Sequence, residues 1–279
     1  MYTTLSGKEP AKALLEKAKA EIAEMEKKPN LVVVLVGDDP ASEIYVRKKL
    51  EKAAAVGAEA RLEKLPAIAT EEEVLIMVNA LNKDEGIDGF IVQAPLPKHI
   101  NYENIVEAID PAKDVDGWTS TSMGKMFLGI GKPFMPATPL AVMRMLEHYK
   151  VDLKGKEVTV IGRSNVVGKP LAFMLLQKSA TVTICHSKTK DLSLHTKHAD
   201  VVVAAAGVPG LVKAEMIKEG AYVIDVGTTR VDGKLKGDVD FDEVIKKAHC
   251  SPVPGGVGPM TVATLIGNVV QAAKIHELG

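Results

Sequence analysis

The sequence predicts an α/β protein with two domains, each built on its own parallel sheet. Short apolar runs rich in β-branched residues alternate with longer segments of helical periodicity, which is typical of parallel sheets covered by helices. The alternation occurs in two series, one over residues 11–109 and one that begins at Val158. Between them, residues 118–137 contain five glycine or proline residues and little periodicity. We therefore expect the boundary between the two series in that segment.

The first series predicts three short strands and the helices that connect them. Residues 11–28 have apolar side chains at helical spacing, and the pattern stops at Pro29. Leu31–Val36 is a continuous apolar run, as expected for a strand buried on both faces. The next elements are expected to be a helix over 41–56 closed by Gly57, a weak strand over 60–66, a helix opened by the capping box Thr70-x-x-Glu73, a strand over 89–93 and a short helix over 101–109.

The second series predicts a further parallel sheet. Thr138 and Pro139 supply an N-cap and a first-turn proline for a helix that precedes it. A long helix with one apolar face is expected over Met260–Leu278. The expected strands are Val158–Ile161, Thr181–Cys185, Val201–Ala205 and Tyr222–Val226.

The composition argues against several classes of protein. Lys plus Arg total 35 and Asp plus Glu total 36, so no net field recruits nucleic acid or an anionic membrane. Residues 1–10 lack a signal-peptide pattern, and the longest aliphatic run is far too short to span a bilayer. Cys185 and Cys250 show no disulfide spacing, and His195 and His198 lack the further ligands that structural zinc needs. We expect a soluble, cytoplasmic protein without a metal.

The turn after Val158–Ile161 is typical of a phosphate site. Gly162 ends the apolar run and Gly168 lies where a helix should begin, so exposed N–H groups and the helix dipole favour an anion there. The spacing Gly-x-Ser-x-x-x-Gly differs from the usual dinucleotide fingerprint, and an ordinary strand-turn-helix is the alternative. The next strand ends in Cys185-His186-Ser187-Lys188 without an acid, while Arg163 follows Gly162. These residues favour the 2′-phosphate of NADP over the free ribose of NAD, although Lys and Ser are also common in surface loops.

The first series contains a polar cluster of its own. Tyr45 and Lys49 are four residues apart on the expected helix and share a face. A lysine transfers protons near neutral pH only when burial or a nearby cation lowers its pKa, and Lys49 taken alone is better explained as part of a solvated helix face. Gln93 ends an apolar strand, at the edge where parallel sheets bind ligands. Asp114 and Asp116 add carboxylates in the loop after the next helix.

The segment 252–261 is dense in glycine and proline. Its glycines allow close backbone contact with a flat ligand, and its prolines limit its mobility. A plain hinge between domains is the competing interpretation.

With these motifs placed, the chain resembles the bifunctional methylenetetrahydrofolate dehydrogenase/methenyltetrahydrofolate cyclohydrolase family over essentially its whole length. The resemblance implies two α/β domains that flank a cleft: residues 1–137 with 260–279 as a folate-binding catalytic domain, and 138–259 as a Rossmann-type NADP-binding domain. Six motifs occur in family order: Ala41-Ser42-x-x-Tyr45-Val46-x-x-Lys49, Val92-Gln93-x-Pro95-Leu96-Pro97, Lys113-Asp114-Val115-Asp116-Gly117, Gly162-Arg163-Ser164-x-x-Val167-Gly168-x-Pro170, Ile224-Asp225-Val226-Gly227 and Pro254-Gly255-Gly256-Val257-Gly258-Pro259-Met260-Thr261.

The activity that the resemblance implies has two steps. The first is the NADP-dependent oxidation of 5,10-methylenetetrahydrofolate to the 5,10-methenyl cation. The second is hydrolysis of that cation to 10-formyltetrahydrofolate. These reactions belong to one-carbon metabolism and purine biosynthesis, and the resemblance further implies a homodimer.

The resemblance also implies roles for individual residues. Lys49 would be the general acid/base of the hydrolytic step, assisted by Gln93, while Tyr45 would stack on the folate. Asp116 would bind the pterin. Further folate contacts are implied for Val46, Arg47, Lys48, Val92, Ala94, Pro254, Gly255, Gly256, Val257 and Gly258, and cofactor contacts for Gly162, Arg163, Ser164, Ser187 and Thr228.

The chain departs from the family pattern at a few positions. Many relatives have lysine where this chain has Glu51 and leucine where it has Ala94. They have cysteine in place of Ala137 and isoleucine in place of Thr228. The alanine at position 137 argues against a required thiol there. These departures bear on affinity and on the balance of the two activities. Two alternatives remain: an NADP-dependent hydroxy-acid dehydrogenase with Lys49 and Asp116 as its proton-transfer pair, and a non-catalytic NADP-binding regulatory module.

Overall fold

The computed structural model describes residues 2–278, which fall into two compact units. The first unit comprises Lys12–Ala137 and the chain from Val262 onward; the second comprises the residues up to Ala11 and Thr138–Thr261. The residues before Lys12 were expected with the first series but group with the second unit, because the N–H of Leu5 donates to the carbonyl of Cys250 at 2.8 Å. No helix within residues 2–278 has the length and apolar character that a membrane span requires.

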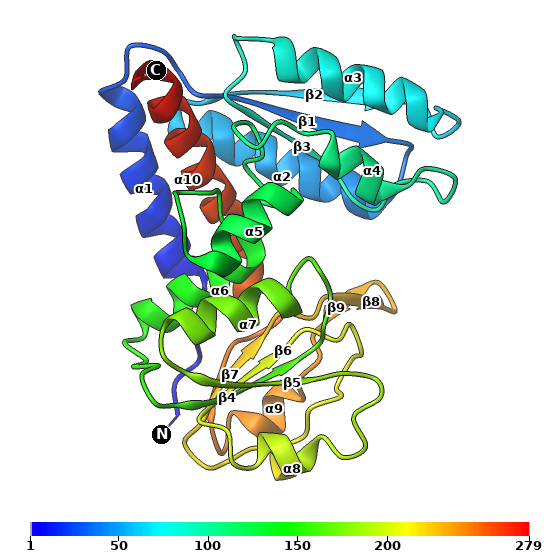
Figure 1. Ribbon diagram of the computed structural model, residues 1–279. Coiled ribbons are helices and arrows are strands. Elements are labelled where there is room, and N and C mark those ends of the chain that lie inside the picture. The colour runs from blue at the N-terminus through cyan, green and yellow to red at the C-terminus, as the bar shows by residue number, and fades with distance from the viewer. Residues whose placement is uncertain (1, 279) are drawn as a thin grey trace. The chain divides into compact units, whose positions relative to one another are not determined.

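A three-stranded parallel sheet forms the centre of the first unit (Figure 1). β1 (Asn30–Val36) lies between β2 (Glu59–Leu65) and β3 (Gly89–Val92). Residues 31–36 are buried throughout, which confirms the prediction of a strand covered on both faces. The helices around this sheet are α1 (Lys8–Ala23), α2 (Pro40–Val56), α3 (Glu71–Lys83), α4 (Tyr102–Glu107), α5 (Ser120–Leu128) and α10 (Val257–Leu278), of which α1 and α10 also extend into the second unit.

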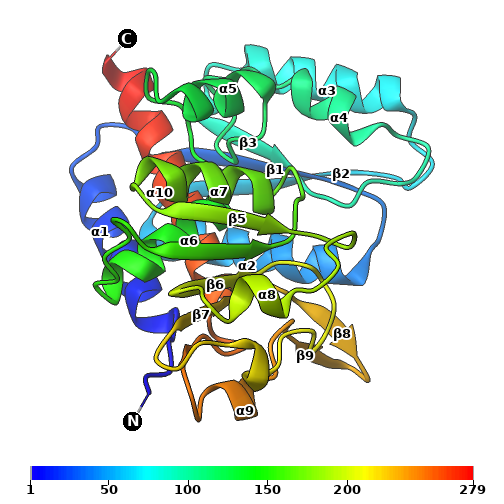
Figure 2. The same cartoon turned by 60° about the horizontal axis from the view of Figure 1, so that its bottom comes forward.

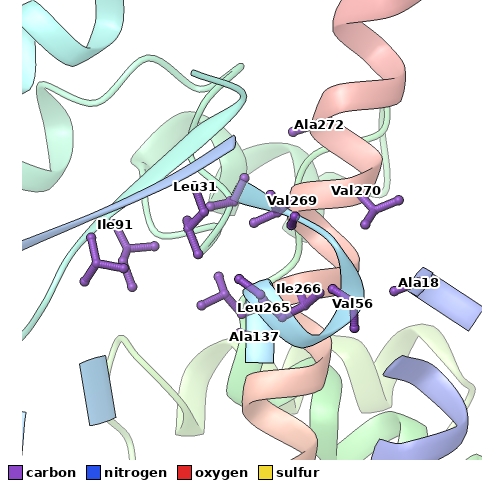
Figure 3. Close-up of a cluster of buried hydrophobic side chains, with 14 of the residues drawn as sticks. Ala18, Leu31, Val56, Ile91, Ala137, Leu265, Ile266, Val269, Val270 and Ala272 are labelled. Atoms are coloured by element: carbon purple, nitrogen blue, oxygen red, sulfur yellow. The ribbon is translucent and has the colours of Figure 1, made fainter. Parts of the chain in front are cut away.

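Alternate residues of β1 belong to two separate hydrophobic cores. Leu31 and Val33 pack with side chains of α1, α2 and α10, and Figure 3 shows Leu31 near Leu265 and Val269 of α10. Val32 packs on the other face, with α3 and α4. Successive side chains of a strand point to opposite faces, so a continuous apolar run is needed to fill both cores.

Local capping signals place the ends of several helices. The Asp39 carboxylate accepts the N–H of Ser42 at 2.8 Å at the start of α2, and Gly57 ends that helix with φ of 94°. The predicted capping box at Thr70 is confirmed at the start of α3. α1, in contrast, ends at Ala23, so Pro29 is not what terminates it.

The segment expected to separate the two series contains a helix that was not predicted. α5 begins after Thr119, whose side chain accepts the N–H of Ser122, and it ends at Gly129 with φ of 67°. These are ordinary cap residues. The helix was missed because it is short and lies among glycines and prolines.

The second unit contains a five-stranded parallel sheet in the order β10-β7-β6-β4-β5. The chain forms β4, then β5 beside it, and returns across β4 to form β6, so the strand order reverses at the β4/β6 pair. This reversal is the topological switch point where doubly wound sheets bind ligands. The strands are β4 (Glu157–Ile161), β5 (Thr181–Cys185), β6 (Val201–Ala204), β7 (Tyr222–Asp225) and β10 (His249–Cys250), which confirms the four predicted strands to within a residue.

Helices cover both faces of this sheet. Figures 1 and 2 show α7 (Gly168–Gln177) on one face, with α8 (Ser193–Thr196) and α9 (Phe241–Val244) on the other. α6 (Ala137–His148) begins before Thr138, and α10 begins at Val257, so both start earlier than predicted. A short 3₁₀ helix, η1, spans Ala214–Met216.

A two-stranded hairpin in the second unit was not predicted. β8 (Thr229–Val231) pairs with β9 (Lys234–Lys236) in antiparallel fashion. The two residues between them, Asp232 and Gly233, both have positive φ, at 51° and 76°. Positive φ at both central residues defines the tight hairpin turn for which Asp-Gly is a preferred pair.

Candidate functional site

Helix α2 and the end of β3 bring Lys49 and Gln93 together in the first unit. The ammonium of Lys49 donates to Oε1 of Gln93 at 2.9 Å. The Gln93 amide nitrogen donates to the carbonyl of Ala94 at 2.6 Å, which turns the amide oxygen toward the lysine. The backbone N–H of Gln93 donates to Val34 at 2.8 Å, so the β1–β3 pairing fixes where this side chain leaves the sheet. Sequence spacing alone did not show this contact.

Lys49 and Asp116 are half-buried, and the charge of each shifts the pKa of the other. Burial lowers the pKa of Lys49, and the negative charge of Asp116 opposes that effect. Burial also raises the pKa of Asp116 to about 6, opposed by the charge of Lys49 and reinforced by that of Asp114. The charge of each group therefore acts on the other, and the lowered pKa of Lys49 moves it toward the range in which a general acid–base group works near neutral pH.

Asp114 has a different role from Asp116, although both belong to one cluster in the sequence. It is 1% exposed, and its carboxylate accepts the backbone N–H groups of Trp118 at 3.0 Å and Thr119 at 2.9 Å. Burial raises the pKa of Asp114. Asp114 therefore shapes the loop from which Asp116 interacts with the lysine.

The other predicted folate contacts of α2 and β3 differ in exposure. Tyr45 is 37% exposed, so its ring is open to a ligand. Arg47 and Lys48 are exposed, and Ala94 is half-buried beside Gln93. The side chains of Val46 (2% exposed) and Val92 (4%) pack in the two hydrophobic cores, so a folate contact by either residue would have to be made by its backbone.

In the second unit, Gly162 and Gly168 form the turn between β4 and α7. Gly162 has a φ of 127°, and a Cβ there would clash with the backbone oxygen of Ala205, the residue after β6. A Cβ on Gly168 would clash with the carbonyl oxygen of Gly162. Only glycine fits both positions, and they lie at the switch point of the sheet. This backbone geometry confirms the predicted strand-turn-helix, and in the first turn of α7 the N–H groups of Gly168 and Lys169 donate to Ser164.

The predicted cofactor residues lie at one edge of this sheet. Ser164 accepts the N–H of Val167 at 3.1 Å and so holds the start of α7. Arg163 is exposed next to it, Ser187 follows β5 and Thr228 follows β7. Because β4, β5 and β7 are parallel, their carboxyl ends share an edge. These side chains and the two glycines could therefore hold a dinucleotide.

Two buried aspartates bind backbone N–H groups at the same edge of the sheet. Neither of them was assigned a role from the sequence. Asp238 accepts the N–H groups of Ala206 and of the next residue at 2.6 and 2.9 Å. Asp225, at the end of β7, accepts those of Gly227 at 3.0 Å and Val239 at 2.9 Å. Burial raises the pKa of Asp225 to about 6. The pair fixes the turns after β6 and β7, and the only signal for it in the sequence was the motif at 224–227.

The predicted loop at residues 252–261, with its expected folate contacts at 254–258, also lies in the second unit. The carbonyl of Gly255 accepts the N–H of Gly7 at 2.9 Å, and a Cβ on Gly256 would lie 2.7 Å from the carbonyl oxygen of Pro252. Val257 and Gly258 belong to the first turn of α10, so the loop is shorter than predicted. Of the expected folate contacts, Pro254 and Gly258 are exposed, whereas Gly256 and Val257 are buried.

Comparisons with known proteins agree over both units. The model of the tetrahydrofolate dehydrogenase/cyclohydrolase catalytic domain matches residues 5–116, and that of the NAD(P)-binding domain of the same family matches residues 136–277. Bifunctional protein FolD 2 of Geobacter metallireducens is 52% identical over 280 residues, which cover 98% of each chain.

Solved structures show the same similarity. The bifunctional FolD methylenetetrahydrofolate dehydrogenase/cyclohydrolase of Campylobacter jejuni has a TM-score of 0.97 at 45% identity over 99% of each chain. The Trypanosoma brucei enzyme, solved with NADP and an inhibitor, has a TM-score of 0.96 at 38% identity and covers 100% of this chain and 99% of its own. The chain described here therefore belongs to the tetrahydrofolate dehydrogenase/cyclohydrolase family.

Proposed function

We propose that this chain oxidises 5,10-methylenetetrahydrofolate with NADP to the 5,10-methenyl cation and hydrolyses that cation to 10-formyltetrahydrofolate. The observation that carries the proposal is the hydrogen bond from Lys49 to Gln93 in a half-buried site beside Asp116. Membership of a family named for both activities supports it. The hydroxy-acid dehydrogenase alternative has no comparable support, since the similarity to shikimate dehydrogenase, at 15% identity, reflects the fold alone.

The oxidation needs little from the protein beyond placement of the reactants. The carbon that loses hydride lies between two nitrogens, which stabilise the resulting cation. NADP supplies the hydride acceptor when bound. Gly162 and Gly168 allow a ligand to approach the backbone closely, and Arg163 provides a cation for the 2′-phosphate. Ser164, Ser187 and Thr228 complete the proposed cofactor contacts.

The hydrolysis requires proton transfer by the protein. Water must lose a proton as it attacks the cation, and the departing ring nitrogen must gain one. Lys49 has a lowered pKa and is held by Gln93, so one group can perform both transfers. The positive charge of the substrate would lower the pKa of this lysine further. An ionised Asp116 would accept pterin N–H groups, while Tyr45 stacks on the ring.

We further propose that residues 1–137 with 260–279 form the functional domain for folate and that residues 138–259 form the one for NADP. The start of the NAD(P)-binding family model at residue 136 supports the boundary near residue 137, although that model extends to residue 277 and so includes the last helix. A homodimer is supported by β5, an edge strand that exposes Ile184, and by α7, which packs against β5 and exposes Leu176. The two free cysteines support a cytoplasmic location, where this activity would supply one-carbon units for purine biosynthesis.

A coupled assay that follows NADPH and the methenyl chromophore separately tests the proposed function. We expect NADPH formation that depends on methylenetetrahydrofolate, together with decay of added methenyltetrahydrofolate without NADP. Turnover of a hydroxy acid but of no folate would establish the dehydrogenase alternative. Binding of NADP without any turnover would establish the regulatory module.

Arg163→Ala is expected to raise KM for NADP roughly 10- to 100-fold and to leave KM for NAD nearly unchanged, because one charge-assisted contact to the 2′-phosphate is lost. Steady-state kinetics with both cofactors measures this. Lys156→Ala, which removes an exposed cation just before β4 at the opposite edge of the sheet, is the matched control. An equal rise in KM for both cofactors would refute the 2′-phosphate assignment.

The pKa of Asp116, raised to about 6, predicts a pH dependence of activity. Above that pH the carboxylate is ionised and can pair with Lys49 and bind the pterin. As the pH falls through about 6 it takes up a proton, so kcat/KM for the folate should decline. Asp116→Asn should have low activity and lack this limb of the pH profile. Persistence of the same limb in that variant would assign it to another group.

A further inference from the structure

A small, partly open cavity adjoins Asp116 in the first unit. Its volume is about 10 Å³, and its polar lining comes from Tyr102, Asp114, Asp116 and Trp118. Apolar residues of β3 and of the α4 region form the rest of its lining. A cavity must offer roughly 10–15 Å³ to hold one water, and such a water persists where several polar groups surround it. This cavity meets both conditions for a single water molecule.

Tyr102 is held in a defined position at this cavity. It is the first residue of α4, whose N-cap Asn101 accepts the N–H of Glu103 at 2.9 Å. Its ring meets that of Trp118 edge to face, with centroids 5.8 Å apart and planes at 74°. The backbone of Trp118 is in turn bonded to Asp114. The phenol is therefore supported from both the helix and the loop that contains Asp116.

The charges around Tyr102 make its phenol a hydrogen-bond donor. Burial and the negative charges of Asp116 and Asp114 raise its pKa, so the phenol keeps its proton. Each oxygen of Asp114 already accepts a backbone N–H group. The Asp114 carboxylate is therefore used to hold the loop backbone, and Asp116 is the carboxylate of this cavity that we consider as the acceptor for a water.

We propose that the cavity binds one water molecule, which accepts the phenolic hydrogen of Tyr102 and donates to the carboxylate of Asp116, and that Tyr102 is thereby a positioning residue for Asp116. The inference rests on the proposed function, in which Asp116 acts as an ionised group. A donor to a carboxylate stabilises its charged form. Tyr102 thus favours the ionised Asp116 that the pterin requires.

Tyr102→Phe removes the donor and keeps the ring. Without the donor the Asp116 carboxylate is less stable in its charged form, so we expect the acid limb of the kcat/KM profile to move up by about one pH unit. Tyr149→Phe is the matched control, because Tyr149 also donates a phenolic hydrogen bond, to the carbonyl of Ser6 at 2.9 Å in the second unit. It should leave the limb in place. A purely structural role would change the melting temperature and not the limb, so an unshifted limb in Tyr102→Phe overturns the proposal.

A crystal structure of the unmutated protein at high resolution supplies a second test that does not depend on a variant. We expect an ordered water within hydrogen-bond distance of both the Tyr102 oxygen and the Asp116 carboxylate. A dry cavity, or a water that contacts only one of these groups, overturns the proposal. If the unmutated protein turned over no folate, the proposed function would fail, while the structure would still decide whether the water site exists.

Discussion

Lys49→Met is expected to lower cyclohydrolase activity by about 100- to 10,000-fold, the range typical of losing a general acid–base group. Methionine has a similar length and fits the half-buried position, but it cannot transfer a proton or donate to Gln93. NADP binding should remain, since the proposed cofactor residues lie on the other unit's sheet. Decay of the methenyl chromophore measures the loss, and calorimetric titration measures NADP binding.

Lys52→Met is the control for that experiment. It makes the same chemical change one turn further along α2, at an exposed position. Both activities should stay within about twofold of the unmutated protein, because an exposed substitution of this kind has small effects. A parallel loss of hydrolysis and of NADP binding in Lys49→Met would show that Lys49 is structural.

Gly162→Ala is expected to weaken NADP binding by at least about 100-fold and to destabilise the second unit by about 2–4 kcal/mol. The added Cβ clashes with the backbone oxygen of Ala205, and φ at this position is 127°. Both atoms in the clash are tied to strand ends, so relief requires the turns after β4 and β6 to separate. That movement would displace the proposed phosphate site. Calorimetric titration with NADP and denaturant unfolding measure the two effects.

Gly155→Ala is the control for Gly162→Ala, because it introduces backbone strain at a positive φ without a steric clash. Gly155 has a φ of 70°, yet nothing lies within 4 Å of a Cβ built there. We expect a loss of about 1 kcal/mol in stability and unchanged NADP affinity. If Gly162→Ala also retained full affinity for NADP, the turn would not be the phosphate site.

Sequence periodicity predicted the two sheets well because strand patterns are local. The run Leu31–Val36 predicted a strand covered on both faces, and the structure fills a core on each side of it. The capping box at Thr70 and the C-terminal Gly57 were equally visible, since caps depend on neighbours in sequence. The Asp232-Gly233 turn had such a local signal and was overlooked.

Other features depended on contacts between distant segments. The resemblance implied a folate contact for Val46, and only the structure shows that the helix directs its side chain into the core. Asp225 and Asp238 hold the turns after β6 and β7, and nothing in their local sequence shows that both are buried. Residues before Lys12 pack with the second unit through a pairing with Cys250 that no local pattern encodes.

The sequence by itself determined most of the strands and helices and several of their caps, because these follow from backbone geometry over a few residues. Only the tertiary structure decided which polar residues do chemistry. Asp114 and Asp116 are nearly identical in sequence context, yet one is bonded to the loop backbone and the other has its pKa raised to about 6 beside Lys49. Desolvation and nearby charge set those differences, and both depend on segments that are distant in the chain.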